Sequence, residues 1–245
     1  MSNDSEIEAI GKTLLRATSD GRQVASRMNL AAYTASVFRM VGRKLHVAGR
    51  AECVNPTPPR SPFGEGDDAT VAVSMLLRIG SQLVSASADL FRDGRTYAAS
   101  VLVRQLVEVE YLAWAFETNN EDSTRWLRST HEQRRAFFTP AKLRAAAGGR
   151  FRSLDYSYHC EMGGHPTPGS WLLLNDDATI AQILLSDCLG HSGRIWDHLV
   201  RWAKSQSNGV VILARNEGML KRYSDWKRID ELTSLPPPGP FPAGW

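Results

Sequence analysis

Two long runs of apolar side chains at helical spacing, joined by a tight turn, occupy residues 67–117. Asp67 and Asp68 stand just before the first run, and aspartate is a preferred residue at the N-terminal cap of a helix. Asp93-Gly94 ends that run, and residues 95–117 form the most apolar helix expected in the chain. A connection this short makes the two helices antiparallel neighbours. The sequence therefore predicts a helical hairpin at the centre of an all-α fold.

Helical patterns also cover most of the remaining chain. We expect further helices over 5–18, 22–49, 121–138, 177–205 and 216–232, and a turn at 140–147. The one strand-like run, residues 210–213, is short and has no partner strand. We expect a single domain that comprises N-terminal helices with a Pro-rich loop (1–66), a helical bundle (67–234) and a Pro-rich tail (235–245).

The overall charge and the cysteines restrict the class of protein. A net charge of +3 implies no strong field that would attract nucleic acid or membrane. Three cysteines without a Cys-x-x-Cys pair are typical of a reducing compartment. No uninterrupted apolar run approaches the length of a bilayer span, because Arg78 and Arg104 interrupt the two best candidates. We expect a soluble cytoplasmic protein that does not associate with membranes.

Residues 151–168 concentrate reactive side chains ahead of a Gly-Gly and Pro-x-Pro break. Arg152 and His159 are separated by about 700° of helical turn, which is about 20° from two full turns. On one helix they would share a face, and the pair suits phosphodiester chemistry. The histidine would act as general acid or base and the arginine would hold the phosphate charge. No metal is needed if the 2′-hydroxyl of RNA is the nucleophile. The alternative is that Arg152 pairs with Asp155 on the surface and His159 is an ordinary half-buried residue.

The Arg-x6-His spacing lies within the Arg-x(4–6)-His signature of the HEPN superfamily. The hairpin 76–117, with Arg104 and Glu108 in its apolar helix, is similar to uncharacterised bacterial HEPN-like proteins. These proteins often carry an Arg-x-x-x-Glu helix and a later Tyr-rich stretch that ends in His-Pro, which here runs from Tyr156 to His165-Pro166. The resemblance covers residues 70–200.

This resemblance implies an all-helical, often dimeric, metal-independent endoribonuclease. It further implies that the protein acts as a toxin or a phage-defence effector. It also implies that Arg152 and His159 are catalytic, with His165 as the rival histidine. If His165 is the matching residue, Ser157 stands where the arginine is expected, and the protein would be a non-nuclease member. The supporting residues would be Asp155, Tyr156, Glu161, Arg104 and Glu108.

Arg104 and Glu108 are one helical turn apart among apolar residues. Buried charges require partners, so the spacing predicts a structural ion pair that is at least half buried. The functional alternative is that Arg104 points into a cleft and binds an anion.

A polar stripe with spacings of four, three and four residues lies on one helical face and consists of Asp187, His191, Arg194 and His198. The plainest interpretation is a solvated face. Otherwise the stripe lines a dimer interface or supplies a second histidine to an active site. A metal site with Asp187 and His191 has no obvious third ligand in the sequence.

Three functions therefore remain open. The first is the HEPN-like ribonuclease, with RNA as substrate, a homodimer as the active form, and neither metal nor cofactor. The second is a catalytically silent helical protein that binds a protein partner or small ligand through residues 151–168. The third is a metal-dependent enzyme that uses the Asp187, His191 and His198 stripe.

Overall fold

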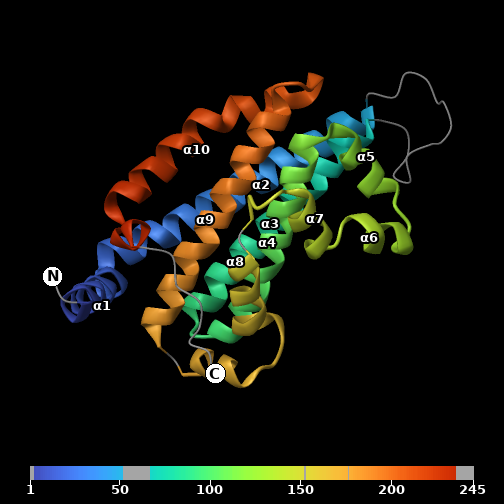
Figure 1. The fold of residues 1–245 in the computed structure, drawn as a ribbon. Helices are drawn as coiled ribbons and strands as arrows, with labels where there is room; N and C mark the ends of the chain where they lie inside the picture. The colour runs from blue at the N-terminus through green and yellow to red at the C-terminus, as the bar shows by residue number, and fades with distance from the viewer. Residues whose placement is uncertain (1–2, 52–66, 152, 176, 236–245) are drawn as a thin grey trace.

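The computed structural model describes residues 3–51, 67–151, 153–175 and 177–235, and every regular element in these ranges is a helix (Figure 1). The predicted all-α class is confirmed. The longer helices are α1 (Asn3–Ser19), α2 (Gly21–Ala51), α3 (Asp68–Arg92), α4 (Thr96–Thr118), α9 (Ala178–Ala203) and α10 (Val210–Ile229). The shorter ones are α5 (Asn120–Arg128), α6 (His131–Phe137), α7 (Pro140–Ala146), α8 (Ser153–His159), η1 (Cys160–Gly164), η2 (Pro168–Leu173), η3 (Ser207–Gly209) and η4 (Glu231–Ser234).

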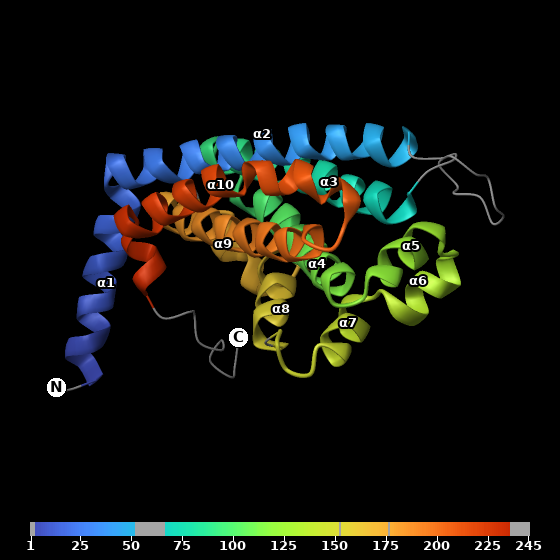
Figure 2. The same cartoon turned by 90° about the horizontal axis from the view of Figure 1, so that it is seen from above.

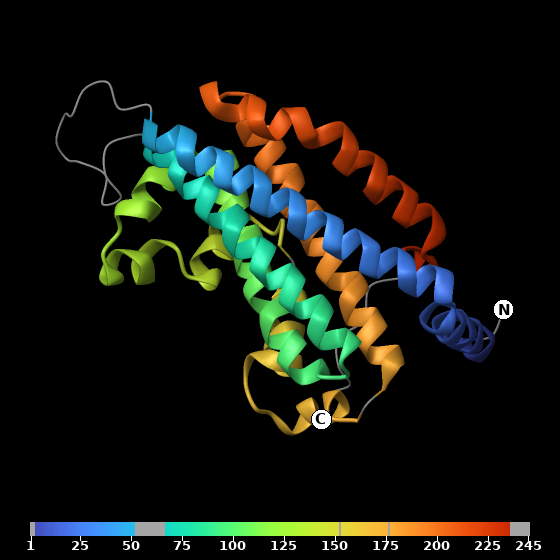
Figure 3. The ribbon, with the colours of Figure 1, turned by 180° about the vertical axis from the view of Figure 1, so that it is seen from behind.

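The predicted central hairpin is α3 and α4. The Asp67 side chain accepts a hydrogen bond from the backbone N–H of Ala69 and so caps α3. Gly94 adopts a left-handed conformation with φ of 73° in the turn that joins the two helices. The helices pack against each other, and α2 lies along α3 on one side while α9 lies along α4 on the other (Figure 3).

Two expected elements differ from those observed. The helix predicted over 121–138 is two helices, because Thr130 starts a new one with a reciprocal capping interaction to Gln133. The helix predicted from residue 216 begins at Val210, so the strand-like run is helical. Its β-branched residues are compatible with helix here because Ile212 is fully buried against the bundle, and tertiary packing outweighs local propensity. The predicted loop at 53–66 and nearly all of the 235–245 tail lie outside the described residues.

The bundle is elongated, with α1 at one end and α5 and α6 at the other (Figure 2). α3 is long and apolar enough to cross a membrane by length and composition, although it contains Arg78. In its most apolar stretch, 67% of the residues are buried inside the protein. Most of this stretch therefore packs inside the bundle.

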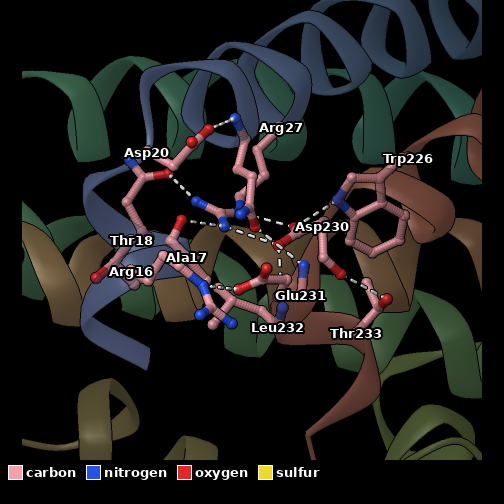
Figure 4. Close-up of polar contacts among 12 residues, drawn as sticks. Arg16, Ala17, Thr18, Asp20, Arg27, Trp226, Asp230, Glu231, Leu232 and Thr233 are labelled. Atoms are coloured by element: carbon pink, nitrogen blue, oxygen red, sulfur yellow. Dashed lines mark hydrogen bonds and ion pairs between the residues drawn. The ribbon is translucent and has the colours of Figure 1, made fainter. Parts of the chain in front are cut away.

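A buried ion pair closes the end of the bundle near α1. The guanidinium of Arg27 on α2 donates to both carboxylate oxygens of Asp230, each at 2.7 Å, and both side chains are fully buried. The same arginine donates to the carbonyl of Ala17 on α1 (Figure 4). It also donates to the side-chain oxygen of Gln182 on α9. Trp226 on α10 donates to Asp230 at 2.6 Å. One charge pair thus joins the ends of four helices.

Candidate metal centre between α4, α8 and α9

The polar stripe of α9 points into the protein at its two histidines. His191 is 1% exposed and His198 is 2% exposed, so the solvated-face interpretation is wrong for them. The physical reason is that α9 is a central helix, with α4 packed on one side and α1 and α10 on another. Periodicity alone could not show that the polar face of this helix is covered as well as the apolar one.

Two groups of three side chains join the buried polar face of α9 to α4, and both groups have the same composition. In each copy a glutamate of α4 contacts a histidine and an arginine of α9, and the copies are Glu110–His191–Arg194 and Glu117–His198–Arg201. The second copy follows the first by seven residues on both helices, which is close to two full turns. From the first copy to the second, the residue numbers increase on both helices, so α4 and α9 run parallel.

Asp187 and His159 join the first copy, and within the part of the chain that the structure describes the second copy has no counterpart to them. His159, at the end of α8, is 3% exposed, and its Nε2 lies 3.1 Å from Nε2 of His191. Asp187 lies one turn before His191, with Oδ2 3.3 Å from His159 Nε2 and Oδ1 3.5 Å from His191 Nε2. Two imidazole nitrogens and a carboxylate therefore converge on one point, within 4.8 Å of one another.

These separations are of the size found between neighbouring ligand atoms of a metal ion. Zinc binds histidine nitrogen at about 2.0–2.1 Å, so neighbouring ligand atoms of a tetrahedral site lie about 3.3–3.4 Å apart. The two imidazole nitrogens are 3.1 Å apart, and the nearest carboxylate oxygens lie 3.3 Å (Oδ2, from His159) and 3.5 Å (Oδ1, from His191) away. One ligand atom from each residue lies within 4.8 Å of the others, which leaves space for a shared ion. The ligand set of two imidazoles and a carboxylate also suits zinc or a similar divalent transition metal.

Glu110 sets the orientation of His191. Burial alone would raise the pKa of Glu110, but its bonds to His191 and Arg194 outweigh burial and lower the pKa to about 2. The carboxylate is therefore ionised and accepts from Nδ1–H of His191 at 2.6 Å. A proton fixed on Nδ1 leaves the Nε2 lone pair directed at His159 and Asp187. A carboxylate behind a histidine is the usual outer shell of a protein metal site.

The two facing Nε2 atoms can approach this closely only with a proton or a cation between them. Without a cation, one imidazole must carry a proton on Nε2 for the pair to approach to 3.1 Å. Burial would lower the pKa of His191, but the carboxylates of Asp187 and Glu110 outweigh burial and Arg194, and raise it. The cluster thus attracts positive charge, which a proton or a metal ion can supply.

The cluster opens to one side through Asp187. Its side chain is 32% exposed and lines a pocket of about 1110 Å³ bounded by α1, α9, α10 and η4. Among the described residues, its inner oxygen Oδ2 is buried and accepts no hydrogen bond. Three protein ligands with an open side resemble a catalytic metal site more than a closed structural one.

Arg104, Glu108 and Tyr156 form a second polar group. Arg104 lies 3.0 Å from Glu108, and both side chains are about two-thirds or more buried, as predicted. The Arg104 guanidinium donates to the hydroxyl of Tyr156, and that hydroxyl donates to Glu108. The triangle fastens α8 to α4 and so positions His159, which is three residues further along α8.

Glu161 and His165 do not join the cluster. The side chains of Glu161 and His165 are exposed, and Ser170 donates to the backbone carbonyls of both residues. Arg152 and the side chain of Asp155 lie outside the described residues, so the Arg152–His159 pair stays a prediction.

Glu110 is the residue that sequence reasoning missed. A signal existed: the motif His-x-x-Arg occurs at residues 191–194 and 198–201, and glutamates stand seven residues apart at 110 and 117. Matching heptad spacing on two helices indicates a repeated contact between them. No family model, curated protein or solved structure matches this chain.

Proposed function

We propose that the protein is a metal-dependent hydrolase whose divalent ion is held by His159, Asp187 and His191. The convergence of two imidazole nitrogens 3.1 Å apart and a carboxylate, with one ligand atom from each residue within 4.8 Å of the others, carries the proposal. Zinc is the best match, because it takes a ligand set of two histidines and one carboxylate in hydrolytic enzymes.

Comparison of the two Glu–His–Arg groups distinguishes a metal site from a simple packing contact between helices. Glu117, His198 and Arg201 join α4 to α9, and among the described residues no third metal-ligating side chain converges on them. The group alone therefore suffices for packing. At His191 the same group gains Asp187 and His159, and burial of these extra polar groups costs free energy that packing does not require. A bound cation explains that addition.

A zinc ion at this place would lower the pKa of a bound water and polarise a substrate carbonyl or phosphoryl oxygen. Glu110 would hold His191 in the ligating tautomer, and Asp187 would face the pocket from which substrate and water arrive. The buried histidines exclude bulk water from the inner side of the site.

Zinc titration of the metal-free protein, with a chromophoric chelator as competitor, tests the site. We expect one tight site per chain in the wild type and its loss in His159→Gln. His198→Gln is the matched control, because it removes a buried histidine from the same helix and the same kind of group but leaves all three ligands. Equal zinc binding by the two variants would contradict the proposal.

A metal-free ribonuclease of the HEPN type is the second candidate. The cluster places two histidines beside Arg194, whose guanidinium lies 2.7 Å from Nδ1 of His191. This combination offers a general acid or base next to a cation that can hold phosphate. A homodimer, a toxin or phage-defence role and a cytoplasmic location belong to that proposal, and the free thiols of Cys160 and Cys188 support the location.

Incubation with a fluorescent RNA separates the two candidates. Cleavage that persists in EDTA and disappears in His159→Gln would favour the ribonuclease. Activity that is lost in EDTA and restored by zinc would favour the metal-dependent enzyme.

A further inference from the structure

The pocket beside Asp187 has largely apolar walls. Side chains from four elements form them: Ile10 and Leu14 of α1, Ile183 and Trp196 of α9, Met219 and Trp226 of α10, and Leu232 and Leu235 at η4. Pockets of this kind bind small molecules through apolar contact and use a few polar groups to orient them. At about 1110 Å³ the pocket has room for a molecule with a long or branched apolar body.

Among the described residues that line the pocket, two acidic side chains, Asp187 and Asp197, stand against two basic ones, Arg194 and Lys227. Arg194 donates to Glu110, and Lys227 lies close enough to Asp197 to favour the ionised form of that carboxyl group. Asp197 nevertheless has a raised pKa, because burial outweighs Lys227 and the neighbouring cations. The formal charges of these described lining residues balance, so they give no net preference for an anionic or a cationic ligand. The pocket therefore suits a molecule without net charge.

Next to Asp187, the wall of the pocket is formed by a residue without a side chain, Gly190. Gly190 lies between Asp187 and Arg194 on the exposed side of α9 and lines the pocket. A Cβ added at Gly190 would meet only the Arg194 guanidinium, at an ordinary 3.5 Å, so packing does not require glycine. At Gly193 the added atom would come within 2.8 Å of the Tyr223 ring, and glycine is needed there for close packing. The space at Gly190 is thus open to a ligand beside Asp187.

We propose that the substrate is a small uncharged amphiphile, an ester or amide of an apolar acid, and this assignment rests on the proposed hydrolase. Its apolar acyl part fills the pocket between α1, α9 and α10, and its carbonyl group lies over Gly190 against Asp187. In the reaction the oxygen of water forms a bond to the carbonyl carbon and the C–O or C–N bond breaks. The water's proton passes to the departing alcohol or amine, and no oxidant or reductant is required.

Binding is tested with the neutral fluorescent probe N-phenyl-1-naphthylamine. The wild type should bind it, and methyl decanoate should displace it more strongly than the decanoate anion. Leu14→Lys places a charge in the apolar wall and should weaken probe binding about tenfold or more. Leu15→Lys is the matched control, because Leu15 is 63% exposed and should leave binding unchanged. Equal affinity of the two variants, or no probe binding by the wild type, would overturn the pocket assignment.

Turnover is tested with p-nitrophenyl esters from acetate to decanoate on the zinc-loaded protein. kcat/KM should rise with acyl length, and Gly190→Leu should abolish turnover while zinc and probe still bind. Zinc-dependent turnover that is equal for all esters would overturn the substrate assignment and leave the metal centre intact. Probe binding without zinc binding would overturn the hydrolase, and with it the substrate assignment.

Discussion

Three histidines are buried, His159, His191 and His198. They differ in the side chains that surround their ring nitrogens. His198 contacts Glu117 and Arg201 through Nδ1. His191 has the equivalent partners on Nδ1 and still presents Nε2 to His159 and Asp187. A metal site therefore depends on two additional residues and not on the histidine itself.

Glu110→Gln should weaken zinc binding about 10–100-fold, the usual effect of removing a group that orients a metal-bound histidine. The amide can no longer act as an ionised acceptor for His191 Nδ1–H, so the ligating tautomer is less favoured. The measurement is a zinc titration against a competing chelator. Glu117→Gln changes the equivalent glutamate of the second copy and should have no effect on affinity. If both variants lost zinc equally, the effect would be one of packing.

At the scale of elements, the sequence predicted the α3–α4 hairpin and the location of α1, α2 and α9 because their apolar periodicity is long and strong. It failed at Thr130 and at residues 210–213, where a local cap and a tertiary contact determined the structure. The polar stripe of α9 was also recognised, but not the direction in which its histidines face. That direction depends on α4 and α8, which are distant in sequence, so no local pattern could reveal it.

The pH dependence of stability should reveal the contact between α4 and α9 at His198. Burial lowers the pKa of His198 below its ordinary value of 6.5, despite the bond to Glu117. The unfolded chain therefore binds a proton in a pH range where the folded protein does not, and stability falls as the pH falls through this range. The stability advantage of the wild type over His198→Gln should be complete above about pH 7 and shrink below 6.5. Urea unfolding of both proteins at several values between pH 8 and 5 measures it, and a constant difference would contradict the assignment.

At the scale of the whole molecule, the Arg27–Asp230 pair joins elements that also form the pocket. Arg27→Met would leave the buried Asp230 carboxylate without its main partner and should cost about 3–5 kcal/mol of unfolding free energy. Replacing Asp230 with leucine as well should recover part of the loss. The exposed pair of Arg16 and Glu231 lies nearby, and Arg16→Met should cost at most about 1 kcal/mol. Equal losses in the two single variants, in chemical denaturation, would contradict this view.

The metal centre, the pocket and the buried pair lie along α9, so a single helix connects the proposed chemistry to the stability of the bundle. The most direct test of the central claim is anomalous diffraction at the zinc edge from crystals of the zinc-loaded protein. We expect one strong peak per chain, about 2.0–2.1 Å from Nε2 of both His159 and His191, with Asp187 as the third ligand. Peaks found only at exposed residues such as His165, with none between the two buried histidines, would contradict it.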